Sequence, residues 1–551
     1  MITSSILPPI DIPNTNLVNY VFTECESHVS SSTEHTVFVD SETKATLTLS
    51  ELRSQTLRLA AGLQQAPFNI GPGDTVAIFA ANGMNYPIAA YAIVAAGATC
   101  TPANPMYTPR ELAHQLTDSH CKMIIVGEGL RPTVDRALAH SSHAVEHILT
   151  MDGSKSMSAN SILKIIKETE TQDDYFFNTR RDNYAEIPAY LCYSSGTTGR
   201  PKGVLLTHRN MVANAMQING LKRFDSGAHT HETFLGLAPF CHAYGLSYVL
   251  HSSVAQGGTI VIMAAYTFEK FLSAIQHFKI TYGYLVPPIV CALSKDPRVD
   301  KFDLTSMHTV LSGGAALSPT LIKTTEARLP GIRIVQGYGM SEMSPATTML
   351  STSHCNPASI GILLAGCQAK VIDDTGSPLG CETPGELCFR GPNIMLGYLN
   401  NPKATEDIFD SEGFLHTGDI GYFDQNGFFY ITDRKKELIK YKGFQVAPSE
   451  LEGILAEHPD VEDAVVMAVY DDDQATEIPK AYIVLRNKAG GKEDQDRRAR
   501  LIVDWLHERV ARYKWLRGGF AVISHIPRSP AGKIVRSSLR NIEHVSSRTQ
   551  S

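Results

Sequence analysis

Short apolar runs alternate with longer mixed segments from the start of the chain to about residue 340. The runs are residues 74–80, 122–127, 259–263, 308–311 and 332–336. Strands separated by helix-length segments are typical of βα units, so this alternation predicts largely parallel sheets. The most apolar window, 87–100, is shorter than the roughly 20 residues that a bilayer span requires, and it predicts a buried helix.

The pattern changes twice in the later part of the chain. Beyond about residue 355, short strand candidates such as 385–390 and 427–432 predict a small β-rich unit. After 433–443 the strand candidates are 461–470 and 480–485, with a helix expected near 498–512. The charged stretch 489–500 is interpreted as a solvated loop and helix start. We therefore expect a domain boundary near Asp433, which gives domains at 1–432 and 433–551.

Composition narrows the class of protein. A length of 551 residues exceeds the usual limit of one core, and 43% hydrophobic with 19% charged residues is typical of a globular protein. The net charge of −7 and the lack of a basic run argue against nucleic acid as a partner. The ten cysteines form no CxxC pair. With no secretory signal, transmembrane segment or C-terminal peroxisomal tripeptide apparent, we expect a cytoplasmic protein.

The segment YSSGTTGRPKGV, residues 193–204, has a composition suited to phosphate. It combines three glycines, four Ser/Thr hydroxyls and the positive charge of Lys202. Glycines free the backbone to point N–H groups at an anion, and the hydroxyls can hydrogen-bond phosphate oxygens. The order differs from GxxxxGK[ST], so a Walker-type NTPase is disfavoured.

This segment closely resembles the phosphate loop of the adenylate-forming superfamily, which includes acyl-CoA synthetases, firefly luciferase and peptide-synthetase adenylation domains. Further segments that match the family follow in the family's order. They are PFCHAYG (239–245), QGYGMSE (336–342), HTGDIGYF (416–423), DRKKELIKYKGFQVAPSELE (433–452) and PRSPAGKIVR (527–536). The resemblance covers nearly the whole chain and is greatest to 4-coumarate:CoA ligases.

The resemblance implies a fold and an activity. The expected fold is α/β, with a large N-terminal domain of two parallel-sheet subdomains plus a small β-barrel, followed by a small mobile α+β C-terminal domain. The expected reaction is ATP-dependent ligation of a carboxylic acid to coenzyme A through acyl-AMP, with Mg²⁺ present.

The resemblance also assigns nucleotide contacts. The phosphates would be held by Ser194, Ser195, Gly196, Thr197, Thr198 and Lys202, and the adenine would be lined by Gln336, Gly337, Tyr338 and Gly339. Ser341 stands where the family usually has threonine, which keeps the hydroxyl. Glu342 would hold Mg²⁺ together with the nucleotide phosphates. Asp419 would accept hydrogen bonds from the ribose, and Arg434 would approach the same nucleotide.

Further residues correspond to the acid site and to the two half-reactions. His242, Tyr244 and Ala315 would line the acid site. Lys533 would contact the carboxylate and the α-phosphate, where it can offset the charge that develops at phosphorus. The C-terminal domain would turn about a hinge at Lys436 and present a second face for thiol transfer. That face carries Lys440, Lys442, Gly443 and Gln445.

Some positions depart from the coumarate ligase pattern. Ala265 stands where those ligases have a lysine that touches coenzyme A, Ala316 replaces a proline, and residues 342–347 read EMSPAT. The acceptor is therefore open between coenzyme A and a carrier protein or synthase that a stand-alone adenylating enzyme would load. A luciferase-like oxygenation has no support in the sequence. A non-catalytic descendant would be expected to lose some of Lys202, Glu342, Asp419 and Lys533. The acid remains open among aromatic, medium-chain and polyketide-derived acids.

Overall fold

A computed structural model gives the structure of the chain. It describes residues 1–30, 34–151, 160–170, 183–194, 201–224, 231–315, 317–434, 437, 439–441, 444–471, 476–510, 512–528, 534–536 and 538–539. For Asp433, Arg434, Lys440, Phe444 and Gln445 the backbone alone is described.

The first unit is a seven-stranded sheet in the order β19-β9-β8-β5-β4-β6-β7. Strands β8, β5, β4, β6 and β7 run parallel, whereas β9 and β19 are antiparallel to their neighbours. The strands are β4 (Thr75–Phe79), β5 (Thr99–Ala103), β6 (Cys121–Val126), β7 (His147–Thr150), β8 (Pro188–Ser194), β9 (Lys202–Thr207) and β19 (Gly397–Tyr398). The helices in this part of the chain are α1 (Leu17–His28), α2 (Leu49–Gln64), α3 (Asn85–Ala95), α4 (Pro109–Asp118), α5 (Arg131–His140), α6 (Ile162–Glu168) and α7 (His208–Phe224).

The apolar window 87–100 is a helix over only part of its length. Helix α3 is buried on nearly all sides, as expected, but it ends at Ala95. Gly97 adopts a positive φ of 85°, and β5 begins two residues later. Apolar content does not separate a buried helix from the buried parallel strand that follows it.

The second unit is a nine-stranded sheet in the order β16-β15-β14-β13-β12-β10-β11-β2-β3. Its strands are β2 (Thr36–Asp40), β3 (Thr46–Thr48), β10 (Thr233–Gly236), β11 (Thr259–Ile262), β12 (Tyr282–Leu285), β13 (Thr309–Ser312), β14 (Arg333–Gly339), β15 (Ala346–Met349) and β16 (Ile362–Leu363). Its helices are the π-helix η1 (Gly245–Ser253), α8 (Phe268–Phe278), α9 (Pro287–Lys295), α10 (Pro319–Arg328), η2 (Pro297–Lys301) and η3 (Ser341–Met343). The central strands β2, β11, β10, β12, β13 and β14 are parallel, as the sequence pattern predicted.

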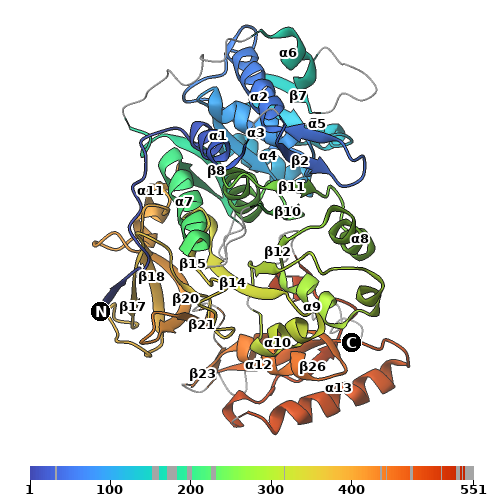
Figure 1. The fold of residues 1–551 in the computed structure, drawn as a ribbon. Helices are drawn as coiled ribbons and strands as arrows, with labels where there is room; N and C mark the ends of the chain where they lie inside the picture. Colours follow the sequence, from blue (N-terminus) through green and yellow to red (C-terminus); the bar gives the residue numbers. More distant parts are fainter. Residues whose placement is uncertain are drawn as a thin grey trace.

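The two faces of the second sheet have different cores. Leu235 of β10 and Leu285 of β12 belong to an apolar cluster with α8, α9 and α10. Phe234 and Tyr284, which alternate with them, belong instead to the large cluster that includes η1, α7 and the first sheet. This large core joins the two sheets, which lie one above the other in Figure 1.

The third unit is a five-stranded antiparallel sheet in the order β1-β17-β18-β20-β21. Its elements are β1 (Ile2–Ser4), β17 (Gln368–Ile372), β18 (Gly385–Arg390), α11 (Pro402–Ile408), β20 (Leu415–Phe423) and β21 (Phe429–Arg434). The first strand of the chain therefore completes a sheet built by residues more than 360 positions later, with Ile2 opposite Lys370. The unit expected as a small barrel is this sheet, and Phe429 of β21 also pairs with Gly361, next to β16 of the second sheet.

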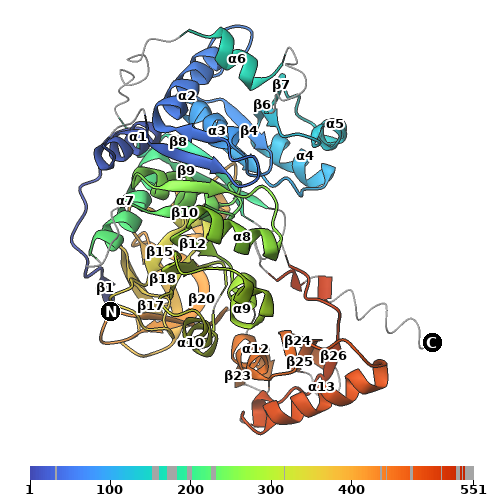
Figure 2. The same ribbon diagram turned by 45° about the vertical axis from the view of Figure 1, so that its right-hand side comes forward.

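The C-terminal part has its own sheets and its own apolar cluster. Its elements are β22 (Ile439–Tyr441), β23 (Phe444–Val446), α12 (Pro448–Glu457), β24 (Val461–Asp471), β25 (Thr476–Leu485), α13 (Lys492–His507), η4 (Arg512–Lys514) and β26 (Phe520–Val522). In Figures 1 and 2 it lies at one end of the molecule beyond α9 and α10. Thr320 Oγ1 of α10 donates a hydrogen bond to Glu457 Oε1 of α12 at 3.3 Å. The boundary expected near Asp433 falls in β21 and stays a prediction.

The expected position of the last long helix was wrong by about one and a half turns at each end. Helix α13 begins at Lys492, inside the charged stretch, and ends at His507. Glu493 and Asp494 lie in its first turn, where acidic side chains interact favourably with the helix dipole. Among the described residues, no helix is long and apolar enough to cross a membrane.

Candidate active site

The glycine-rich segment connects two antiparallel strands. Ser194 at the end of β8 pairs with Lys202 at the start of β9, and Tyr193 pairs with Gly203. The pairing of β8 with β9 therefore extends up to the two residues that flank the segment. Ser195, Gly196, Thr197 and Thr198 lie outside the described residues.

Lys202 and Glu342 lie on two sides of one tyrosine. The Lys202 Nζ is 4.8 Å from the centroid of the Tyr398 ring, and the Tyr398 hydroxyl donates to Glu342 Oε1 at 2.8 Å. Tyr398 reaches this position because β19 pairs with β9, with Tyr398 opposite Val204. Burial, and then the negative charge of Glu342, raise the pKa of Tyr398, so it remains a neutral donor. Glu342 itself is 4% exposed.

Tyr398 was not predicted from the sequence. The strand that carries it has two residues, and the contact with Glu342 spans 56 positions. A local pattern of apolar residues carries no signal for such a contact.

Strand β14, between β15 and β13 in the second sheet, carries the expected adenine segment. The Gln336 side chain is used within the protein: Oε1 accepts from the Leu317 N–H at 3.0 Å, and Nε2 donates to the Pro357 carbonyl at 3.0 Å. It therefore anchors neighbouring loops. Gly339 packs so closely that an added Cβ would lie 1.6 Å from the Pro345 carbonyl oxygen. A Cβ added to Gly337 would lie 3.2 Å from the Tyr248 hydroxyl oxygen.

Asp419 joins the third sheet to this segment. Its Oδ2 accepts a hydrogen bond from the Tyr338 hydroxyl at 2.7 Å, and its N–H donates to Thr417 Oγ1 at 3.0 Å. Asp419 is 8% exposed and pairs in register with Arg434, whose side chain lies outside the description. Two residues expected at the nucleotide, Tyr338 and Asp419, are thus in direct contact. Ser341 begins η3, one residue before Glu342.

His242 and Tyr244 form one turn before η1. The Tyr244 N–H donates to His242 Nδ1 at 3.2 Å, so the proton of the neutral imidazole is on Nε2. The Tyr244 hydroxyl donates to the Leu311 carbonyl at 2.9 Å, and its ring packs on Gly313. Burial raises the pKa of Tyr244. Ala315 is exposed in the turn after β13, and Ala316 lies outside the described residues.

The residues expected to alternate between half-reactions are only partly described. Lys440 and Gln445 are opposite each other in the β22–β23 hairpin. Their side chains are outside the description, as are Lys436, Lys442, Gly443 and Lys533 entirely. Ala265 lies between β11 and α8 and is exposed.

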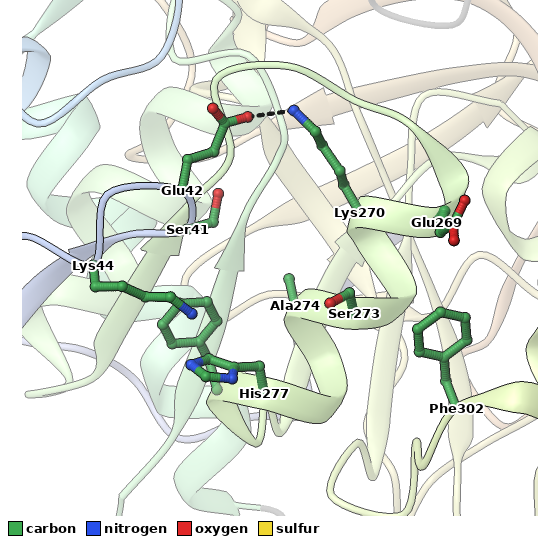
Figure 3. Close-up of a pocket in the computed structure, with 10 residues that line it drawn as sticks. Ser41, Glu42, Lys44, Glu269, Lys270, Ser273, Ala274, His277 and Phe302 are labelled. Carbon is green, nitrogen blue, oxygen red and sulfur yellow. Dashed lines mark hydrogen bonds and ion pairs between the residues drawn. The ribbon is translucent and has the colours of Figure 1, made fainter.

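A surface hollow of about 380 Å³ lies between α8 and the turn that follows β2. Figure 3 shows the ion pair of Glu42 and Lys270, 2.6 Å apart, at its edge. Lys44 lies over the Phe278 ring in the same hollow. None of the residues expected at the nucleotide or the acid lines it, so we assign it no part in the reaction.

Comparison with known sequences gives two family matches. The sequence profile described as AMP-binding enzyme matches residues 25–399, and that described as AMP-binding enzyme C-terminal domain matches residues 450–533. The chain is 34% identical over 550 residues to probable 4-coumarate–CoA ligase 2 of Dictyostelium discoideum, covering 98% of this chain and 97% of the relative. It is 36% identical over 547 residues to 4-coumarate–CoA ligase 2 of Nicotiana tabacum, with the same coverages.

Solved structures share the fold over nearly the whole chain. ATP-bound MatB from Rhodopseudomonas palustris has a TM-score of 0.82 at 25% identity and covers 96% of this chain and 99% of that chain. The anthranilate CoA ligase AuaEII, in complex with anthranoyl-AMP, has a TM-score of 0.84 at 23% identity, with coverages of 97% and 98%. At 23% identity, the similarity to AuaEII shows only that the two chains share a fold.

Proposed function

Because the chain belongs to the AMP-binding enzyme family, as an AMP-forming acid–thiol ligase, we propose that it joins a carboxylic acid to coenzyme A in two steps at one site. In the first step a carboxylate oxygen attacks the α-phosphorus of ATP, and pyrophosphate leaves. In the second step the thiol attacks the acyl carbon, and AMP leaves. The two relatives described above are named as 4-coumarate–CoA ligases, one of them as probable, and the acid of this chain remains open among aromatic, medium-chain and polyketide-derived acids.

The observation that supports this proposal best is the arrangement of Lys202, Tyr398 and Glu342. A cation and a carboxylate are held on one ring at the base of the glycine-rich segment. In the proposed function Lys202 binds polyphosphate, and Ser194 to Thr198 surround it. Such a reaction requires alignment and charge neutralisation more than covalent help from the protein.

Glu342 is suited to bind a Mg²⁺ ion that arrives bound to ATP. It is a single buried carboxylate, and the described residues contain no cluster of three or more metal-ligating side chains. Mg²⁺ is commonly held by one or two carboxylates together with nucleotide phosphates. When bound, Mg²⁺ would neutralise phosphate charge. The Tyr398 hydrogen bond fixes one oxygen of Glu342 and orients the carboxylate.

Tyr338 and His242 organise two further parts of the proposed site. Asp419, held by Tyr338, binds the ribose hydroxyls beside Arg434. His242 has its proton on Nε2, where it can donate to the acid carboxylate. The adenine lies along Gln336 to Gly339, where the close approach of the Pro345 carbonyl leaves no room for a side chain at Gly339.

We propose that the C-terminal part contributes different residues to adenylation and to thiol transfer. Lys533 acts in adenylation, whereas Lys440, Lys442, Gly443 and Gln445 act in thiol transfer after rotation at Lys436. The second candidate acceptor, a carrier protein, is favoured by Ala265, which supplies no charge for a coenzyme A phosphate.

A pyrophosphate-release screen tests both candidates. Purified chain is incubated with ATP, Mg²⁺ and a panel of acids, with and without coenzyme A. The proposal expects pyrophosphate with a subset of acids, and acyl-CoA when the thiol is present. Acyl-AMP without any acyl-CoA would favour the carrier-protein acceptor. No pyrophosphate with any acid would refute adenylation.

A further inference from the structure

Asn82 joins the first sheet to the loop that carries His242. It lies between β4 and α3 and is half-buried. Its Nδ2 donates to the Gly236 carbonyl at 3.2 Å and to the Ala238 carbonyl at 3.0 Å. Its Oδ1 accepts from the Phe240 N–H at 2.8 Å. All three partners lie in the segment that runs from the last residue of β10 toward η1.

These bonds allow the Asn82 side chain one orientation. The amide nitrogen can only donate and the amide oxygen can only accept, so two carbonyls and one N–H fix which way the amide faces. Phe240 is fully buried, and the Tyr86 ring of α3 packs edge-on against it with the centroids 5.5 Å apart. The first sheet and its helix therefore hold this segment by one polar and one aromatic contact.

The segment that Asn82 holds leads directly into the turn of His242. The His242 N–H donates to the Pro239 carbonyl at 3.0 Å, and the Leu246 N–H donates to the His242 carbonyl at 2.9 Å. A Cβ added to Gly245 would lie 2.2 Å from the Pro239 carbonyl oxygen. Because this turn is so closely packed, a shift of the backbone at Phe240 would also move His242.

We infer that Asn82 is a positioning residue that holds the His242 imidazole in place for the carboxylate of the acid. It acts through the backbone of residues 236–240. Ligands of parallel α/β sheets bind outside the carboxyl ends of the strands, and Asn82 joins the carboxyl end of β4 in the first sheet to that of β10 in the second. The inference rests on the proposed function, because that proposal places His242 at the acid.

A role in stability alone gives a different expectation. Replacing Asn82 would then lower the thermal midpoint and the fraction of active protein, which lowers kcat and leaves the KM for the acid unchanged. A displaced His242 would instead weaken the use of the acid and leave the KM for ATP unchanged. Separate KM values for the two substrates therefore distinguish the roles.

The experiment measures pyrophosphate release and the thermal midpoint for the wild type, Asn82→Ala, Asn82→Asp, His242→Ala and the double variant with alanine at both positions. The probe is the acid that releases pyrophosphate fastest in the screen described above, in which benzoate, cinnamate and octanoate represent the aromatic and medium-chain classes. Asn85→Ala is the matched control. Asn85 is also half-buried and begins α3, but its Nδ2 donates to the Met151 carbonyl at 3.0 Å, outside the His242 loop.

Asn82→Ala is expected to lower kcat/KM for the acid about tenfold or more, because the buried Phe240 N–H loses its partner. Asn82→Asp keeps the shape of the side chain but turns an oxygen toward two carbonyls, so it should lose at least as much. In the His242→Ala background, Asn82→Ala should cause little further loss, because the effects of residues that act through one another are not additive. Asn85→Ala should match the wild type.

Wild-type kinetics in Asn82→Asp would overturn the inference, and this comparison does not depend on the folding of Asn82→Ala. An equal loss from Asn82→Ala with and without His242 would also overturn it. If His242→Ala loses activity and both Asn82 variants match the wild type, the inference fails and the proposed function stands. A wild type that releases no pyrophosphate with any acid would refute the adenylation itself and this inference with it.

Discussion

The Tyr398 hydroxyl lies 2.8 Å from Glu342 Oε1, and the same tyrosine ring faces the Lys202 ammonium. Tyr398→Phe removes the hydrogen bond and keeps the ring. A buried carboxylate that loses its donor costs about 1 to 3 kcal/mol. We expect weaker use of ATP, with a higher Mg²⁺ concentration needed for half-maximal pyrophosphate release.

Tyr430→Phe is the matched control for this change. The Tyr430 hydroxyl donates to Asp424 Oδ2 at 2.9 Å, and neither residue is assigned to the nucleotide or to Mg²⁺. Its removal should leave the Mg²⁺ requirement unchanged. Equal Mg²⁺ titrations for wild type and Tyr398→Phe would show that Tyr398 does not orient Glu342.

Asp419→Ala and Lys202→Ala should both weaken the use of ATP, whichever acid is supplied. Each removes a charge-assisted contact with the nucleotide, which is worth about 1.5 to 3 kcal/mol, or roughly one to two decades in kcat/KM for ATP. Tyr338→Phe should have a smaller effect in the same direction, because it releases Asp419 without removing it. Unchanged ATP kinetics in Asp419→Ala would remove the ribose assignment.

The two half-reactions should be separable by mutation. Lys533→Ala is expected to abolish nearly all adenylation and still convert supplied acyl-AMP to thioester. Lys440→Ala and Gln445→Ala, opposite each other in the β22–β23 hairpin, should do the reverse. Single-turnover assays of each step measure this. Equal loss of both steps in all three variants would mean one fixed site and no hinge at Lys436.

Ala265→Lys should tighten coenzyme A if that thiol is the acceptor. Ala265 is exposed, so the gain from one new ion pair is about 0 to 1 kcal/mol. The KM for coenzyme A is the measurement, with the KM for ATP as the internal control. A lower KM for both substrates would indicate an effect on folding or on the general charge of the surface.

His251 should make the protein sensitive to acid. It is fully buried in η1, neither ring nitrogen has a hydrogen-bond partner among the residues that the structure describes, and burial lowers its pKa to about 3. Because an unfolded histidine has a pKa of about 6.5, the unfolded chain binds a proton below that pH and the folded chain does not until about pH 3. His251 therefore lowers stability as the pH falls through this window.

His251→Leu should remove this part of the acid sensitivity. The expected difference between wild type and variant is about 2 kcal/mol between pH 6.5 and pH 5. Thermal unfolding at both pH values measures it, and His140→Leu, at an exposed helix end, is the control. Parallel loss of stability in wild type and His251→Leu would contradict this assignment.

Much of the fold could be predicted from the sequence because buried parallel strands are short apolar runs. The runs at 74–80, 122–127 and 259–263 became β4, β6 and β11, and 385–390 is β18 to the residue. The α/β class and the family were confirmed. Helix α13 was misplaced because its charged first turn resembles a loop.

The site could be predicted only as far as local motifs reach. Tyr338 and Asp419 were each recognised in a motif, but their contact crosses 81 positions between two sheets. Tyr398 belongs to no motif, since its place beside Glu342 comes from the pairing of β19 with β9. The positions of Ser195 to Thr198, Lys442 and Lys533 fall outside the described residues and stay predictions.

The pairing of β1 with β17 constrains how the chain can fold as it leaves the ribosome. Residues 2–4 are synthesised more than 360 residues before their partners at 368–370. Until β17 has been made, β1 has no strand with which to pair. Because contacts of such long range form late, we expect the two parallel sheets to assemble first and the amino-terminal strand to be added afterwards.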